Sequence, residues 1–285
     1  MVNSFTGAGS FSSGMSLNAG YLEENYGVDA WGLWTRVDEW TGGSIGPYKG
    51  NVCFEKGDTL LQLAKSITGH GADSKELKIN NKLKIKQIVN IAPLLKKLEE
   101  RNRKSVVAAA ARFKGRFPRG QEKFENGSSV DPKNLDDWFK EGKKGCVDCL
   151  GAAFIVIAKG LSDSIGNANF VALYKVNAFP RERYSVKIGE SKNGDWGYFL
   201  NDKNYPDKHT RGGYRGENVI KVGNDQWWGF PGGIKSQAGW AQILIKEYNR
   251  GLPRTEHINK IPGWSGNAIF INNSKVGMDL FDKNN

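Results

Sequence analysis

Hydrophobic residues recur along the chain in patterns that predict helices first and a mixture of strands and helices later. Residues 92–114 carry apolar residues at intervals of three and four, with Pro93 near the start, which predicts a long helix. Residues 150–158 form the most apolar run of the chain and predict a buried helix. Shorter helices are expected at 135–140 and 237–249.

Beyond this buried helix the pattern changes to short runs of β-forming residues bounded by turn residues. The expected strands are 169–176, 195–200, 218–222, 226–230 and 268–272, with a tight turn at 223–225. The fold class predicted for the second half is therefore α+β.

The N-terminal part of the chain differs in composition. Residues 1–27 begin with a Gly-, Ser- and Asn-rich stretch and are predicted to be a flexible lead, and the tryptophans of 28–50 suggest a docking segment. Residues 53–65 resemble the opening of a LysM module, with a short strand, a turn and a helix capped by Asp58 or Thr59. The Gly- and Lys-rich continuation departs from that module. We expect a small unit at 28–92 and a larger domain at 93–285.

Charge and hydropathy exclude some classes of function. The net charge is +11, but Lys and Arg are interleaved with acidic residues and form no single stripe, so nucleic acid is not an expected partner. No stretch approaches the roughly 18 apolar residues of a membrane span, and the start of the sequence lacks a Sec-type signal. We expect a protein that is cytoplasmic, or delivered by a specialised secretion route as part of a longer chain.

Candidate chemistry lies at the start of the buried helix. Cys149 follows Asp148 directly ahead of the apolar run, and the unsatisfied amides of a first helical turn favour a thiolate over a thiol. A nucleophilic cysteine is the hypothesis. The alternative is a cysteine that only packs, because free cysteine is among the most buried residue types.

Cys146 and Cys149 also form a C-x-x-C motif, which admits a redox pair or half of a zinc site. The central residues are not those of a typical redox motif. The other metal ligands available are Cys53, His70, His209 and His257, at scattered spacing. Neither a metal nor a cofactor is predicted.

Two segments together resemble a known family. Residues 148–166 and residues 214–220 are similar to the nucleophile helix and to the second motif of the spore-coat protein-glutamine gamma-glutamyltransferases of bacilli. Weaker similarity extends the resemblance over roughly 93–285. It implies a nucleophilic Cys149 partnered by Glu217. Where the family has a glutamate before the nucleophile this chain has Asp148, and Phe230 replaces a family histidine.

The resemblance implies acyl transfer. The thiolate attacks a glutamine carboxamide, ammonia leaves, and a lysine amine or water resolves the thioester, giving an isopeptide crosslink or deamidation. The backbone N–H groups of Cys149 and Leu150 are the expected oxyanion donors. Proton transfer needs the pKa of Glu217 raised or that of Cys149 lowered. Trp227, Trp228, Phe230 and Asn218 are candidates for the substrate groove.

Two other classes of function stay open. A buried helix headed by Asp-Cys and followed by strands is common to papain-like enzymes, so an NlpC-type cysteine peptidase or peptidoglycan amidase is the main alternative. Such enzymes place a histidine where this chain carries Glu217, and His209 is in a predicted loop. A non-enzymatic structural or adaptor protein would leave Cys149 unreactive. The predicted core is papain-like in either enzyme, with the nucleophile helix packed on an antiparallel sheet.

The biological role suggested by this organisation is that of a toxin or effector domain from a longer chain. The expected partners are proteins bearing Gln and Lys, and a cognate neutralising (immunity) protein.

Overall fold

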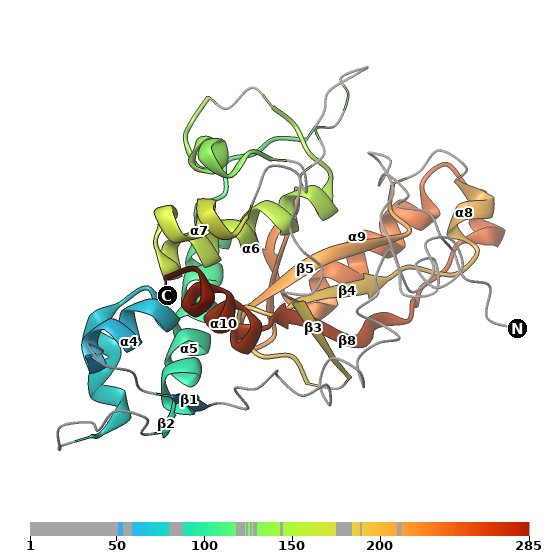
Figure 1. Cartoon of the computed structure of the whole chain (residues 1–285). Helices are drawn as coiled ribbons and strands as arrows, with labels where there is room; N and C mark the ends of the chain where they lie inside the picture. Colours follow the sequence, from blue (N-terminus) through green and yellow to red (C-terminus); the bar gives the residue numbers. More distant parts are fainter. Residues whose placement is uncertain are drawn as a thin grey trace, which may run out of the picture.

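The structure is a computed structural model that describes residues 51–53, 59–79, 88–117, 123, 125, 127, 130–142, 145–174, 184–188, 190–209 and 213–284. Within these ranges an antiparallel sheet lies at the centre and helices cover both of its faces (Figure 1). The predicted lead at 1–27 and the docking segment at 28–50 lie outside the described residues.

The central sheet has six strands in the order β3-β8-β4-β5-β6-β7, and all neighbours pair antiparallel. The strands are β3 (Tyr184–Ile188), β4 (Trp196–Leu200), β5 (Gly216–Gly223), β6 (Gln226–Gly229), β7 (Gly233–Lys235) and β8 (Gly263–Ile271). Four of the predicted strands are confirmed as β4, β5, β6 and β8. The strands β3 and β7 were not predicted.

One face of the sheet is covered by α5 (Ala92–Arg112), α6 (Cys149–Ile165) and α10 (Asn273–Asn284), which share the main hydrophobic core with it. The long helix and the buried helix of the sequence analysis are thus confirmed. The helices α5 and α6 pack closely, because Gly160 of α6 faces the backbone of Val106. This packing places the first residue of α6 against the middle of β5.

The opposite face of the sheet is covered by α9 (Gln237–Asn249), whose predicted bounds are confirmed. The side chain of Ser236 accepts from the backbone N–H of Gly239 and caps the helix. The indole of Trp240 donates to the carbonyl oxygen of Trp227 at 3.0 Å. A second hydrophobic cluster forms here around Phe199, Val219 and Trp240.

One predicted strand is wrong. The segment 169–176 was expected to be extended, but residues Asn167–Leu173 form the helix α7. Phe170 in α7 and Tyr174 at its C-cap are four positions apart, the spacing of one helical face, and their rings stack with centroids 4.4 Å apart. The short helix expected at 135–140 is part of the 3₁₀ helix η4 (Pro132–Phe139), capped by Asp131.

The part of the chain before α5 packs directly on the rest of the protein. It contains β1 (Asn51–Cys53), which pairs with β2 (Ile88–Asn90), the helix α4 (Leu60–Thr68) and the 3₁₀ helix η2 (Gly71–Leu77). Of the two predicted caps of α4, Thr59 is the one that accepts from the backbone, at Gln62. A third hydrophobic cluster joins α4 and η2 to Leu94 and Leu95 of α5.

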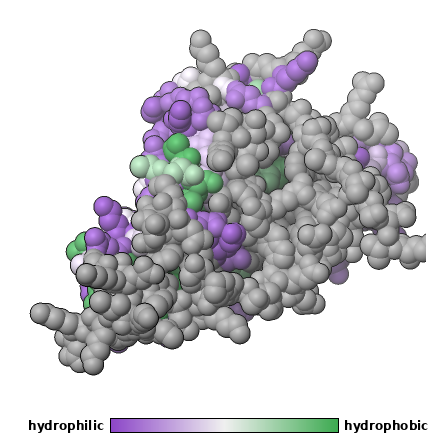
Figure 2. All heavy atoms as spheres, viewed as in Figure 1, coloured by the Kyte–Doolittle hydropathy of each residue, from purple (hydrophilic) through white to green (hydrophobic). Residues whose placement is uncertain are grey.

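Two short helices, α8 (Tyr205–Lys208) and η6 (Arg254–Glu256), complete the described elements. On the face shown in Figure 2, hydrophilic residues predominate among the coloured atoms, in keeping with the burial of most apolar side chains in the three clusters. Of the helices described, none combines the length and the apolar character needed to cross a bilayer.

Candidate active site

The helix α6 begins at Cys149 because Asp148 caps it. The Asp148 backbone is extended, its Oδ1 accepts from the N–H of Gly151 at 2.7 Å, and its carbonyl oxygen accepts from Ala152 at 2.9 Å. These bonds satisfy two of the first four amides of the helix. The N–H groups of Cys149 and Leu150 are left without an acceptor inside the helix.

The sulfur of Cys149 is held by Asn218 of β5. The Asn218 side-chain amide donates to Sγ at 3.3 Å, and its backbone N–H also hydrogen bonds to the thiol. The side-chain oxygen of Asn218 accepts from the indole of Trp196 at 3.0 Å, which fixes the orientation of the amide. Both partners are buried, with exposed fractions of 6% for Cys149 and 0% for Asn218.

Glu217 lies next to Asn218 on β5 but on the other side of the strand, because successive side chains point to opposite faces. Its carboxyl group is 2% exposed and accepts from the backbone N–H of Phe230. Gly229 makes room for it, since a Cβ there would lie 3.2 Å from Glu217 Oε1 and 2.6 Å from the ring of Trp240. Within the described part of the chain, Oε1 has no hydrogen-bond partner.

Burial dominates the electrostatics of both groups. It raises the pKa of the Glu217 carboxyl well above its usual value, and the charge of Asp148 adds to this effect. The pKa of the Cys149 thiol is also raised well above its usual value, first by burial and then by the charges of Glu217 and Asp148, while the Asn218 hydrogen bonds oppose the shift. From the sequence alone, the helix terminus is expected to favour a thiolate. Here desolvation outweighs it, so the neutral thiol is favoured.

The pKa of the Tyr214 hydroxyl is shifted by the same surroundings. Burial, followed by the charges of Glu217 and Glu247, raises its pKa to about 12, and Cys149 contributes to the shift. Cys149 is therefore buried among groups that disfavour additional negative charge.

Three of the expected groove residues pack inside the protein. Trp228 and Phe230 belong to the main core and contact Phe113 edge-on, with ring centroids 5.6 and 5.3 Å apart. Trp227 belongs to the cluster under α9. Phe230 touches the site through its backbone N–H, and the aromatic side chains at the site include Trp196, at Asn218, and Trp240, beside Glu217. Neither tryptophan was predicted to be a site residue.

The C-x-x-C cysteines are both free thiols, and Cys146 hydrogen bonds to the carbonyl oxygen of Lys123 at 3.1 Å. In the described ranges no three His, Cys, Asp or Glu side chains come together as metal ligands. His70, His209 and His257 each hydrogen bond to a backbone carbonyl in a different part of the fold. The structure thus pairs Cys149 with an amide and places no described histidine on it.

Comparisons with known proteins point to one family. The sequence model described as protein-glutamine gamma-glutamyltransferase matches residues 118–260, which are 143 of the 285 residues. A protein-glutamine gamma-glutamyltransferase of Bacillus pumilus is 26% identical over 136 residues, covering 45% of this chain and 54% of that protein. The chain thus spans about half the length of the curated relative it matches.

Among solved structures, the transglutaminase from Geobacillus stearothermophilus (without C-terminal extension) aligns with 65% of this chain and 96% of that chain. The sequence identity is 19% and the TM-score is 0.49. The family model includes both Cys149 and Glu217 and extends over half of the sequence. The chain belongs to the protein-glutamine gamma-glutamyltransferase family.

Proposed function

We propose that this chain transfers acyl groups from glutamine side chains of proteins through Cys149. The observation that carries the proposal is the position of the thiol at the start of a buried helix, with two N–H donors of Asn218 on its sulfur. Hydrogen bonds to sulfur stabilise the thiolate, which is the nucleophilic form. The family to which the chain belongs supplies the substrate class.

The proposed first step forms a thioester. The Sγ atom of Cys149 attacks the glutamine carboxamide carbon, and the carbon–nitrogen bond then breaks as the nitrogen takes up a proton and leaves as ammonia. The oxyanion of the intermediate is stabilised by the N–H groups of Cys149 and Leu150, which the helix leaves free of acceptors. Asp148 contributes by fixing the helix start.

Glu217 is the proposed proton acceptor and donor. Burial raises the pKa of the Glu217 carboxyl, which makes its carboxylate a stronger base than that of an exposed glutamate. Glu217 points to the face of β5 opposite Cys149, so proton transfer between Glu217 and Sγ requires the Glu217 side chain to be reoriented toward the thiol when substrate binds.

The thioester is then resolved by a lysine amine, giving an isopeptide crosslink, or by water, giving glutamate. A site that excludes water favours the amine.

The arrangement of a cysteine-bearing helix on an antiparallel sheet supports the papain-like core. A papain-like peptidase is disfavoured, because no described histidine contacts Cys149. Cytoplasmic location or delivery by a specialised route, the toxin or effector role and the immunity partner stay predictions.

The test is ammonia release from a glutamine-rich protein, with and without a primary amine. Cys149→Ala should abolish release, and Glu217→Gln should lower it by about 100-fold or more. Cys146→Ala is the matched control, since it removes a second buried thiol three residues away and should leave release nearly unchanged.

Amine incorporation separates transglutamination from deamidation. Loss of activity in both cysteine variants would instead favour the redox or zinc interpretation of the C-x-x-C motif. No release from folded wild-type protein would contradict the proposal and make peptidoglycan the next substrate to test.

A further inference from the structure

A cavity of about 850 Å³ lies between α5, the turn that precedes β4 and the end of β5. Its cationic lining consists of Lys97, Arg101, Arg103, Lys104, Lys192 and Lys221, and against these the described lining holds a single carboxylate, Glu100. The volume is in the range of ligand pockets. Lys97, Arg101 and Arg103 are each paired with a carboxylate, so the charge open to an anion is that of the other three lysines.

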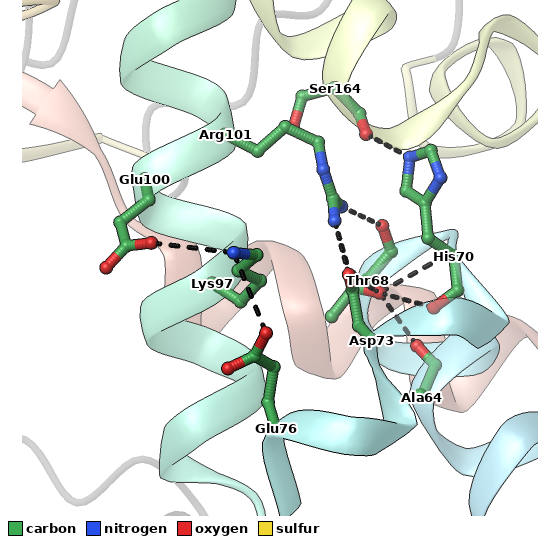
Figure 3. Close-up of polar contacts among 9 residues, drawn as sticks. All are labelled: Ala64, Thr68, His70, Asp73, Glu76, Lys97, Glu100, Arg101 and Ser164. Atoms are coloured by element: carbon green, nitrogen blue, oxygen red, sulfur yellow. Dashed lines mark hydrogen bonds and ion pairs between the residues drawn. The ribbon is translucent and has the colours of Figure 1, made fainter.

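Two of these cations, Arg101 and Arg103, are held by carboxylates that do not line the cavity. Arg103 forms ion pairs with Asp195, which is fully buried, and with Glu99 at 2.8 Å. Arg101 donates two hydrogen bonds to the carboxylate of Asp73. Figure 3 shows the guanidinium group directed at this carboxylate. The anchoring groups fix these two guanidinium groups on the cavity wall, so binding an anion costs less side-chain entropy.

Other cations lack such partners. Lys104 and Lys192 are exposed, and in the described part of the chain neither forms an ion pair with a carboxylate. Lys221 donates to the carbonyl oxygen of Ser191 at 2.9 Å and its ammonium lies 5.5 Å from the centroid of the Trp227 ring, and neither partner carries a negative charge. Like charges gathered at one cavity repel each other, and a bound anion relieves that repulsion.

The spacing of the charges indicates a ligand with several negative groups. Lys97, Arg101 and Lys104 recur at intervals of four and three and therefore share one face of α5 over about 10 Å. In an extended peptide, side chains on the same face recur about every 7 Å. The described lining contains no Phe, Tyr or Trp on which a base could stack. An acidic peptide segment fits this chemistry better than nucleic acid.

We propose that this cationic cavity binds an acidic segment of the protein whose glutamine is the acyl donor. The proposal that this acidic segment belongs to the acyl-donor protein rests on the proposed function. The strand β5 links the two sites, since Lys221 follows Glu217 by four residues, or about 13 Å of extended chain. An acidic segment docked in the cavity raises the local concentration of nearby glutamines at Cys149.

Binding is measured first, with a fluorescent, glutamine-free peptide that carries a run of glutamates, by anisotropy at low and moderate salt. Wild-type protein should bind it saturably, and Lys104→Glu with Lys192→Glu should weaken binding about tenfold or more. The control double variant, Lys246→Glu with Lys260→Glu, makes the same change in net charge at exposed lysines outside the cavity and should stay within about twofold.

Turnover is measured second, with a donor peptide whose glutamine is flanked by glutamates and one flanked by serines. The cavity variant should raise KM for the acidic donor alone and leave kcat unchanged. Thermal melts confirm that both double variants are folded. Because the anisotropy assay needs no catalysis, its outcome is independent of whether ammonia is released.

Equal weakening in both double variants, or no saturable binding by the wild type, would overturn the site. Tighter binding of a single-stranded oligonucleotide of equal charge, lost in the cavity variant, would assign it to nucleic acid. If the cavity variant weakens peptide binding but leaves the KM for the acidic donor unchanged, the bound segment does not belong to the acyl donor.

Discussion

Asn218 donates to the sulfur of Cys149 while its own oxygen accepts from the Trp196 indole, so the amide is fixed at both ends. A fixed donor aimed at a developing thiolate stabilises charge without reorganising during the reaction. In the buried site of Cys149, where desolvation and two carboxylates disfavour the thiolate, these N–H groups act in the opposite direction. Asn218 is therefore the residue on which formation of the nucleophile depends most directly.

Replacing Asn218 by Ala should raise the pKa of the thiol further. The thiolate forms as pH rises through this pKa, so the ultraviolet absorbance of the Cys149 thiolate should appear at higher pH than in wild type. Hydrogen bonds to charged groups contribute about 1.5–3 kcal/mol, which corresponds to roughly a 10- to 100-fold lower thiolate fraction at a given pH below the pKa.

Asn201→Ala is the control for the Asn218 variant. Asn201 is also a buried asparagine, but its amide donates to the carbonyl oxygens of Tyr214 and Leu244. The Asn201→Ala variant should have a lower melting temperature than wild type, and its thiolate should appear at the same pH as in wild type. In each case the Cys149 signal is the absorbance that is lost in Cys149→Ala. An unchanged titration in folded Asn218→Ala would contradict the role given to the amide.

At the scale of elements, the site depends on how closely α6 approaches α5. A Cβ at Gly160 would lie 2.4 Å from Cγ2 and 2.6 Å from Cα of Val106. Because the second atom belongs to the backbone, the two helices would have to move apart. Such a movement would be transmitted along α6 to Cys149.

Gly160→Ala should therefore destabilise the protein by about 1–3 kcal/mol, although Ala is intrinsically the better helix former. Chemical denaturation measures this change, and ammonia release should fall with it. Gly239→Ala in α9 is the matched control, since its Cβ would meet only Lys235 and Ser236 side-chain atoms at 3.3 Å or more. A gain of stability in Gly160→Ala would show that the helices are not in close contact.

The elements themselves were largely readable from the sequence. The long apolar or periodic runs predicted α5, α6 and α9, and the turn at 223–225 separated β5 from β6. The segment of α7 misled the prediction because its two aromatic residues suggest a strand as readily as a helical face. The strand β7 has only three residues, too few for a local pattern, whereas β3 alternates apolar and polar residues over five positions and was missed although its pattern is that of a strand.

The site was readable only in part. The helix start at Cys149 and its cap could be predicted, because both depend on adjacent residues. The contact between Asn218 and Cys149 could not, because it depends on which face of β5 meets α6. Val219 and Ile220 are both apolar, and only the structure shows that Val219 lies in the cluster under α9 and Ile220 in the main core, which places Asn218 toward α6 and Glu217 away from it.

At the scale of the whole molecule, the segment before α5 is joined to the helix that carries the nucleophile. Burial acts against the Asp73 carboxylate, but hydrogen bonds from Arg101 and Thr68 hold its pKa below the usual value. His70 reaches the carbonyl oxygen of Ser164 in α6 at 2.7 Å (Figure 3). Residues 59–79 thus support both α6 and one wall of the cationic cavity. Their role as a separate domain stays a prediction.

The central claim is that Cys149 becomes acylated by glutamine. The most direct measurement is the intact mass of the full chain after rapid acid quenching with a glutamine peptide in the absence of amine. The account predicts a mass gain equal to the peptide less one ammonia, located on Cys149 by peptide mapping and absent in Cys149→Ala. A chain that releases ammonia with no such adduct on Cys149, or that carries the adduct on Cys146, would contradict it.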